Sequence, residues 1–113
     1  MPKINYSPRS LRDLLEIGDY IAEELHNPSA ALQTVQRIQE TIDKLSMYPQ
    51  MGARLSTKYE DVGDYRFVVS GHYLAFYRVV ADTVYIDRVL YGKRDYVNIL
   101  FGCTLEDDDG EEM

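Results

Sequence analysis

Hydrophobic residues in the first half of the chain recur at helical spacing. Residues 3–6 alternate enough to form a short strand, and Ser7-Pro8 then has the form of an N-cap followed by proline at the first helical position. Apolar residues follow at steps of three and four, which predicts an amphipathic helix over residues 8–25. The apolar stripe consists of Leu11, Leu14, Leu15, Gly18, Ile21, Ala22 and Leu25.

A second helix is predicted directly after the first. Asn27-Pro28 repeats the start signal. The apolar series that follows has the spacing of a coiled-coil seam, and the short connection requires the two helices to form an antiparallel hairpin. Pro49-Gln50-Met51-Gly52 ends the helical part, and residues 53–63 have no clear period, which indicates a loop. The seam consists of Ala31, Val35, Ile38, Ile42 and Leu45.

The second half of the chain alternates as β-strands do. Strands are predicted over residues 65–69, 73–80 and 83–90, with turns at Ser70-Gly71 and Ala81-Asp82. Connections this short allow only hairpins, so these strands form an antiparallel meander. We therefore expect an α+β fold: an N-terminal strand, then an antiparallel helical hairpin packed on one face of an antiparallel β-meander. A short C-terminal helical turn is expected over residues 96–101.

Length and charge suggest one domain with an acidic tail. The chain of 113 residues fits a single domain, which we place at residues 1–105. The net charge of −7 is concentrated at residues 106–113, which contain six of the 19 acidic residues. Residues 1–105 contain 12 basic and 13 acidic residues, which gives a net charge of about −1, so the domain itself is nearly neutral. A like-charge run at a terminus is usually solvated and disordered; the alternative is that this tail folds back over a basic surface.

Several classes of protein are disfavoured by composition. No apolar run approaches the roughly 18–20 residues that span a bilayer, and residues 1–5 lack the apolar core of a signal peptide, so we expect a cytoplasmic protein. The single cysteine, Cys103, cannot form an internal disulfide. His26 and His72 are far apart, which disfavours a metal site. The chain lacks a glycine-rich phosphate loop and a GxSxG motif, and Asp82 and Asp87 are a poor candidate for a catalytic carboxylate pair.

The strongest candidate for a binding segment is residues 88–96. Its sequence, Arg-Val-Leu-Tyr-Gly-Lys-Arg-Asp-Tyr, places cations and tyrosines around a glycine at a strand end. Guanidinium groups bind carboxylate or phosphate in a forked geometry, and tyrosines add rigid contact area, so the segment suits an anionic surface. The alternative is that Arg88 and Arg94 form exposed ion pairs with Asp87 and Asp95. The residues alone do not choose between these interpretations.

The ten tyrosines pose a similar question. Tyr73 and Tyr77 share one face of the predicted 73–80 strand, and Leu74, Phe76 and Arg78 share the other. Tyrosine is favoured where one end is buried and the other is wet, as at the margin of a core or at an interface.

The sequence as a whole resembles the ParE branch of the ParE/RelE toxins. The resemblance covers residues 4 to about 101, and it depends on the order and spacing of several short matches. These are Asp19-Tyr20-Ile21, Asn27-Pro28 with Ala30-Ala31, Ile42 and Leu45, Pro49 with Gly52, Tyr65-Arg66, residues 73–79 and residues 88–96. It implies a compact toxin of a type II toxin–antitoxin system.

The resemblance also implies partners. A cognate antitoxin is expected to wrap the toxin with a helix and an extended segment, and we expect it to contact the hairpin and the sheet. The target in the ParE branch is DNA gyrase, and in the RelE branch it is mRNA in the ribosome. We expect no cofactor, no membrane association and no direct DNA binding by the toxin alone. The expected antitoxin-binding residues are Leu14, Ile21, Arg66, Tyr73, Tyr77 and Arg78.

The residues favour the ParE branch over the RelE branch. RelE-like enzymes need basic side chains on the middle strands to hold the scissile phosphate and stabilise its developing charge. Those positions correspond here to Tyr65, Phe67 and Leu74, and the family's late tyrosine corresponds to Leu100. Only the arginine after Gly-Lys is kept, as Arg94.

We therefore expect a binder of gyrase, with an mRNA endoribonuclease or a non-toxic interaction module of the same fold as alternatives. Arg94 is the one retained catalytic candidate, and Tyr91 or Tyr96 could replace the missing tyrosine. The expected target-binding residues are Arg88, Tyr91, Lys93, Arg94 and Tyr96.

Overall fold

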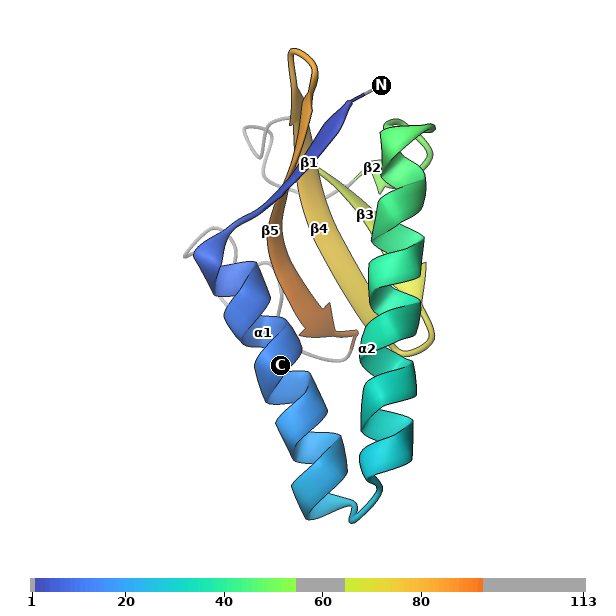
Figure 1. Cartoon of the computed structure of the whole chain (residues 1–113). Coiled ribbons are helices and arrows are strands. Elements are labelled where there is room, and N and C mark those ends of the chain that lie inside the picture. Colours follow the sequence, from blue (N-terminus) through green and yellow to red (C-terminus); the bar gives the residue numbers. More distant parts are fainter. Residues whose placement is uncertain (1, 55–64, 93–113) are drawn as a thin grey trace, which may run out of the picture.

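Two helices pack against a five-stranded sheet in the computed structural model, which describes residues 2–54 and 65–92 (Figure 1). The α+β fold is therefore confirmed. The predicted C-terminal helical turn and the acidic tail lie outside the described residues. In chain order the elements are β1 (Lys3–Tyr6), α1 (Pro8–Asp19), the π-helix η1 (Tyr20–Glu24), α2 (Pro28–Asp43), the 3-10 helix η2 (Lys44–Ser46), β2 (Ala53–Arg54), β3 (Arg66–Ser70), β4 (Tyr73–Val80) and β5 (Thr83–Tyr91).

The sheet contains the predicted meander and two further strands. The strand order is β1-β5-β4-β3-β2, and β3, β4 and β5 pair antiparallel. The N-terminal strand β1 pairs with β5 in parallel, from Lys3 opposite Thr83 to Tyr6 opposite Ile86, so the sheet is mixed. The prediction of a loop was wrong for residues 53–54, which pair with β3. Two residues are too few to show a period, so only the pairing reveals this strand.

The first turn of the meander is shifted by one residue from its prediction. Ser70 is the last residue of β3, and it lies opposite Tyr73, so the turn is Gly71-His72 instead of Ser70-Gly71. Gly71 takes φ +61, and glycine enters this left-handed region at little cost. Glycine at the first position of a two-residue turn is typical of hairpins. The second turn is Ala81-Asp82, as predicted.

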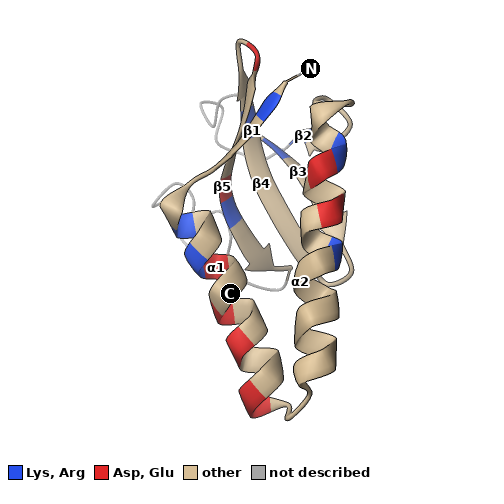
Figure 2. Cartoon of the chain, viewed as in Figure 1, with Lys and Arg blue, Asp and Glu red and all other residues tan. Residues whose placement is uncertain are grey.

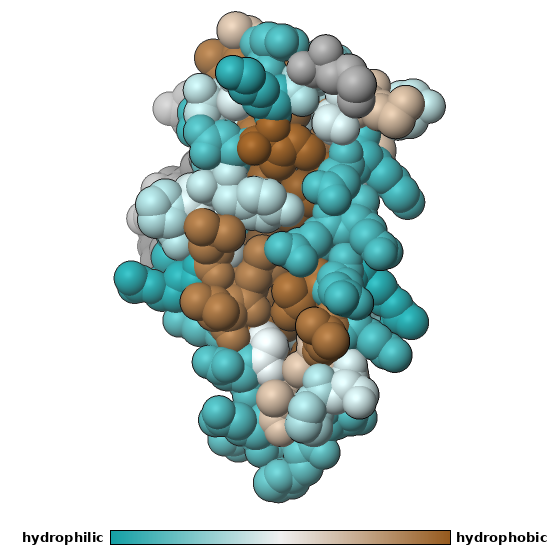
Figure 3. Space-filling view, viewed as in Figure 1, coloured by the Kyte–Doolittle hydropathy of each residue, from teal (hydrophilic) through white to brown (hydrophobic). Residues whose placement is uncertain are grey.

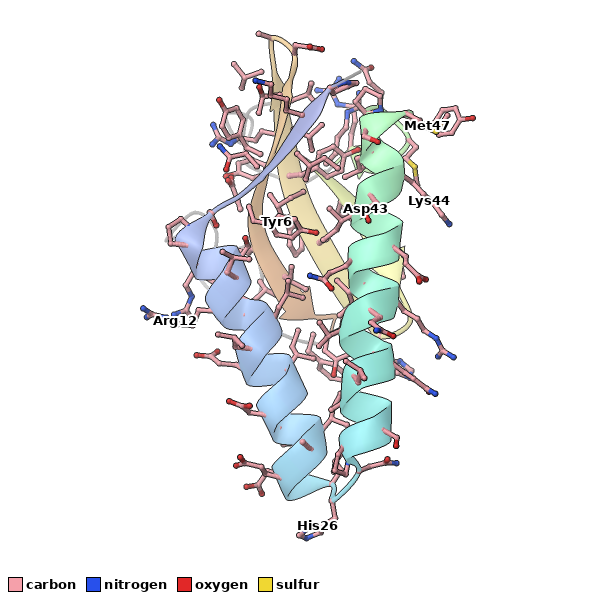
Figure 4. All side chains as sticks on the ribbon, viewed as in Figure 1. Tyr6, Arg12, His26, Asp43, Lys44 and Met47 are labelled. Carbon is pink, nitrogen blue, oxygen red and sulfur yellow. The ribbon has the colours of Figure 1, made fainter. Side chains whose placement is uncertain are left out.

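Both helices begin where the capping signals predict. The Ser7 hydroxyl oxygen accepts a hydrogen bond from the Ser10 backbone N–H at 3.0 Å, and the Asn27 side chain accepts one from the Ala30 N–H at 3.1 Å. Such caps satisfy backbone donors that have no partner within the first helical turn. The first helix changes from α to π geometry at Tyr20. His26, with φ +52, follows it at the tip of the hairpin (Figure 4).

The main core lies between the hairpin and the sheet. One buried tyrosine in it, Tyr77, is also held by polar contacts: its hydroxyl donates to the Pro49 carbonyl at 2.9 Å and accepts from the Gly52 N–H at 3.0 Å. A Cβ at Gly52 would lie 2.5 Å from the Tyr77 hydroxyl and 2.7 Å from the Phe67 carbonyl, so this close approach requires glycine. The buried members are Leu14, Ile38, Ile42, Leu45, Val68, Ala75, Tyr77, Val84, Ile86 and Val89.

A smaller cluster lies on the opposite face of the sheet. Phe76 and Leu90 are buried there, and Tyr65, Phe67 and Leu74 pack against them. The predicted division of β4 into two faces is therefore confirmed, because Tyr73 and Tyr77 belong to the hairpin side.

The hairpin is longer than the sheet. Figure 1 shows α1 and η1, with α2 beside them, continuing past the ends of β4 and β5. The hairpin therefore has a portion that the sheet does not support, and hollows form around it. None of the helices in the described part of the chain is long and apolar enough to cross a membrane.

Candidate functional site

An apolar groove runs along the outer side of the helical hairpin. It has a volume of about 610 Å³, and its wall includes the exposed leucines Leu11, Leu15 and Leu32. The helices approach closely at Gly18, where a Cβ would lie 3.5 Å from a Val35 methyl carbon. The lining residues are Leu11, Leu14, Leu15, Gly18, Asp19, Pro28, Ala31, Leu32, Val35 and Gln39.

Figure 3 shows hydrophobic side chains gathered across the middle of the helical face. Leu15 and Leu32 have 68% and 62% of their surface exposed, which is unfavourable for a free protein in water. Contiguous apolar surface of this kind marks a place where another molecule docks. A groove between two helices fits the apolar face of a third helix.

A second hollow lies where the hairpin extends past the sheet. Its volume is about 790 Å³. The rings of Tyr73 and Tyr91 meet edge to face with their centroids 5.8 Å apart, and burial raises the pKa of Tyr73, with further contributions from Tyr91 and Tyr20. The described lining residues are Asp13, Glu16, Ile17, Tyr20, Ile21, Leu25, Ala30, Thr34, His72, Tyr73, Val89, Leu90 and Tyr91.

Arg88, predicted to contact a target, is held inside the fold. Its Nε and Nη2 donate to the two carboxylate oxygens of Asp13, on α1, at 2.8 and 3.1 Å. The same carboxylate accepts the Val89 N–H at 2.9 Å. The alternative interpretation, an exposed pair of Arg88 with Asp87, is wrong, because the side chains of Arg88 and Asp13 are only 15% and 3% exposed.

Beyond the end of β1, Ser7 and Asp13 bind the backbone along the edge of β5. The pairing of β1 with β5 stops at Ile86, and Ser7 then donates from its N–H to the Ile86 carbonyl and from its hydroxyl to the Asp87 carbonyl. Farther along, Asp13 satisfies the Val89 N–H. The first turns of α1 thus satisfy backbone groups that a neighbouring strand would otherwise bind.

The sheet face away from the helices carries an ion pair between Arg78 and Asp87. Arg78 donates from Nε to Asp87 at 3.0 Å, and its guanidinium lies 5.9 and 5.7 Å from the ring centroids of Tyr65 and Tyr85. Asp87 also accepts a hydrogen bond from the Tyr65 hydroxyl. Burial and this bond raise the pKa of Tyr65 to about 12. Asp87 is therefore held by Arg78 and Tyr65, and Asp82 lies in a turn away from it.

The three positions that correspond to RelE cations are aromatic or aliphatic, and they pack together. Tyr65, Phe67 and Leu74 all contact the buried pair Phe76 and Leu90. Arg78 lies on the same face of the sheet, and Asp87 neutralises it.

The predicted antitoxin-binding residues are divided between the core and the surface. Leu14 and Ile21 are 5% and 7% exposed, and Tyr77 is fully buried, so these three offer little or no surface to a partner. Arg66 donates to the Gly52 carbonyl at 3.0 Å. Tyr73 is partly exposed in the second hollow, and Arg78 is exposed in its ion pair.

The predicted target-binding segment is described only at its beginning. Tyr91 is 41% exposed at the end of β5, next to the second hollow. Lys93, Arg94 and Tyr96 lie outside the described residues. Among the described residues, no three or more His, Cys, Asp and Glu side chains come together as metal ligands would.

The outer groove was not predicted from the sequence, although the apolar stripe of the first helix carries a signal for it. The seven-residue stripe, which runs from α1 through η1, is too wide for one buried face. Leu11, Leu15 and Gly18 form one row, and Leu14 and Ile21 form another. The second row enters the core, whereas the first row remains in the groove. Leu32 lies outside the predicted seam of α2 and faces the first row. Two adjacent apolar rows on one helix indicate one partner within the fold and a second partner outside it.

Comparison with known proteins identifies the family. The sequence model of the family described as the ParE toxin of the type II toxin–antitoxin system, parDE, matches residues 4–96. The chain belongs to the ParE toxin family. A chain of the solved structure entitled "Chromosomal ParDE TA system from P. aeruginosa" is similar, with 26% identity and a TM-score of 0.68. The similarity covers 80% of this chain and 96% of that chain. No curated protein matches the sequence.

The family relationship gives the surfaces their context. A ParE-family toxin of a type II system has a cognate antitoxin as its partner. The match includes both helices and all five strands, so the outer groove and the second hollow both belong to the toxin domain.

Proposed function

We propose that this ParE-family toxin arrests growth by binding DNA gyrase and inhibiting it without breaking a bond, and that its cognate antitoxin neutralises it by covering the helical hairpin. The alternative for this fold is cleavage of mRNA in the ribosome. The two differ in whether the sheet displays cations that are free to hold a phosphate.

The observation that carries the proposal is the composition of the sheet face away from the helices. Phosphodiester cleavage by the RelE mechanism needs several cations around the scissile phosphate. In the described strands, the corresponding positions Tyr65, Phe67 and Leu74 form a small apolar cluster. Arg78 is engaged by Asp87. A face of this kind supports adhesion to a protein far better than it supports charge stabilisation.

The choice of gyrase follows from the resemblance to the ParE branch, and a supercoiling assay tests it. Purified toxin is expected to inhibit ATP-dependent supercoiling of relaxed plasmid by gyrase in proportion to its concentration. It is expected to leave mRNA on programmed ribosomes intact. Normal supercoiling together with cleaved ribosomal mRNA would refute the proposal and establish the endoribonuclease.

The target-binding segment is proposed to be the chain that follows Tyr91. Arg88 is not part of this proposed surface, because Asp13 holds it. We expect Arg94→Ala to abolish gyrase inhibition, and a thermal unfolding midpoint within about 2 °C of the parent will show that the variant is still folded. A fully inhibitory Arg94→Ala protein would exclude this residue from the surface.

The antitoxin is proposed to place an apolar helix in the outer groove. An aspartate there would have to be desolvated on binding, so Leu15→Asp and Leu32→Asp are each expected to weaken the complex at least about tenfold. Met47→Asp is the matched control, because Met47 is also 63% exposed but lies after η2, beyond the C-terminal end of α2 and away from the groove (Figure 4).

The readout is rescue of growth by the co-expressed antitoxin, followed by calorimetry with purified proteins. Toxicity of each variant alone shows that it still folds. If both groove variants are rescued as well as Met47→Asp, the antitoxin binds elsewhere.

A further inference from the structure

We propose that the second hollow is a cation-binding site that receives the arginine or lysine side chain of the bound antitoxin. The identity of the occupant rests on the antitoxin docking proposed above. The site itself is defined by four side chains on the hairpin and the sheet: Glu16, Tyr20, Tyr73 and Tyr91.

Three tyrosine rings surround the space. Tyr20 lies at the junction of α1 and η1, and Tyr73 and Tyr91 lie opposite each other at the ends of β4 and β5. The Tyr73 and Tyr91 rings meet at 67°, and the centroid of the His72 ring lies 6.4 Å from that of Tyr91. The faces of aromatic rings are electronegative, so a group of rings around a hollow attracts a cation.

The rings are accessible. Tyr20 and Tyr91 have 56% and 41% of their surface exposed, so a bound molecule can reach both rings. Tyr73 is half-buried beside them, and burial raises its pKa, with smaller contributions from Tyr91 and Tyr20.

The charge of the wall also fits a cation. Asp13 and Glu16 both line the hollow, but Asp13 is neutralised by Arg88. Glu16 is exposed, and no described residue forms an ion pair with it. Figure 2 shows acidic residues along α1 from its middle to its end, whereas its basic residues lie near its start. None of the described lining residues is a lysine or an arginine.

The remaining wall is apolar, which suits a long basic side chain. Ile17 and Leu25, which keep exposed surface in the hollow, can cover the methylene groups while the charged end meets the rings and Glu16. An acidic segment is a poor occupant, and residues 106–113 of the same chain carry six carboxylates, so repulsion disfavours this tail as the ligand. A basic side chain on an antitoxin helix that fills the outer groove has the right charge and the right shape.

A titration with small probes tests the site without the antitoxin. The full-length toxin, isotope-labelled, is titrated with N-acetyl-arginine methylamide, and the ring signals of Tyr20, Tyr73 and Tyr91 are followed by NMR. The neutral isostere N-acetyl-citrulline methylamide is the matched probe.

We expect saturable shifts of the three rings with arginine, in the millimolar range, and binding at least about fivefold weaker with citrulline. Glu16→Gln and Tyr91→Leu should each weaken arginine binding about fivefold, whereas Glu40→Gln on α2 should leave it unchanged. Equal binding of arginine and citrulline, or full arginine binding by Tyr91→Leu, would overturn the inference.

A second arm links the site to the antitoxin. In calorimetry with the purified antitoxin, Glu16→Gln is expected to weaken the complex about fivefold and to reduce its dependence on salt, since one charge pair is lost. An unchanged salt dependence would show that the antitoxin places no cation here. If the probe titration fails while Leu15→Asp still disrupts the complex, this inference is wrong and the proposed antitoxin docking stands.

Discussion

Replacing Arg88 by methionine tests how the hairpin is fixed to the sheet. Arg88 is held by Asp13 through two hydrogen bonds of 2.8 and 3.1 Å, in a place where Asp13 is only 3% exposed. Methionine keeps most of the apolar stem and removes the charge. The Asp13 carboxylate then keeps the Val89 N–H at 2.9 Å and the ion pair with Arg9 at 3.4 Å.

The expected loss follows from these contacts. Breaking a buried ion pair by removing one partner costs about 3–5 kcal/mol, because the other charge stays buried without compensation. Two of the contacts to Asp13 remain in the variant, so we expect the lower end, about 3 kcal/mol. For a domain of this size that loss lowers the thermal unfolding midpoint by about 12 °C.

The measurement is urea unfolding followed by circular dichroism, with a double-mutant cycle. Arg9→Met is the control, because the Arg9 side chain is 45% exposed and an exposed ion pair contributes less than about 1 kcal/mol. Asp13→Asn combined with Arg88→Met removes both charges and keeps an oxygen that can accept the Val89 N–H, so it should recover at least about 1 kcal/mol over Arg88→Met alone.

One result would refute this reasoning. If Arg88→Met unfolds within about 0.5 kcal/mol of the parent and yet loses gyrase inhibition, Arg88 is not a structural residue. The interpretation of residue 88 as part of the target-binding surface would then be correct.

Three further predictions concern stability. Tyr77→Phe leaves the Pro49 carbonyl and the Gly52 N–H without their buried partner, and it should cost about 1–3 kcal/mol in urea unfolding. Burial and the nearby Asp43 raise the pKa of Tyr6 to about 12 from an unfolded value of 10.0 (Figure 4). The contribution of this shift to stability is complete below pH 10 and is lost as the pH rises to about 12. The free energy of unfolding of Tyr6→Phe should therefore fall less steeply than that of the parent over this pH range. Ala81 takes φ +54, so Ala81→Gly should raise the free energy of unfolding by up to about 1 kcal/mol, and a lower value would show that the turn is unstrained.

Local signals in the sequence account for most of the fold. Ser7 and Asn27 start the helices because their side chains bind backbone donors three residues later, and that spacing is visible in the chain. The hairpins of the meander follow from connections of two residues. Parallel pairing of β1 with β5 could not be predicted, because the partners are about 80 residues apart and no local pattern encodes their register.

The candidate sites were less accessible to sequence reasoning. The aromatic and aliphatic character of the middle strands could be predicted, because it depends on residue type alone. The burial of Arg88 could not, since its partner Asp13 is 75 residues away in the sequence. Tyr91 was recognised as part of a binding segment, but its grouping with Glu16 and Tyr20 depends on how far the hairpin extends past the sheet.

By itself the sequence determined the helical hairpin, the meander and the family, because capping, periodicity and the spacing of short motifs act between residues close in the chain. The tertiary structure alone decided which apolar row of α1 enters the core, which charges neutralise each other and which rings share a hollow. Each of these depends on the packing angle and overhang of the hairpin on the sheet, and side chains from distant segments set both together.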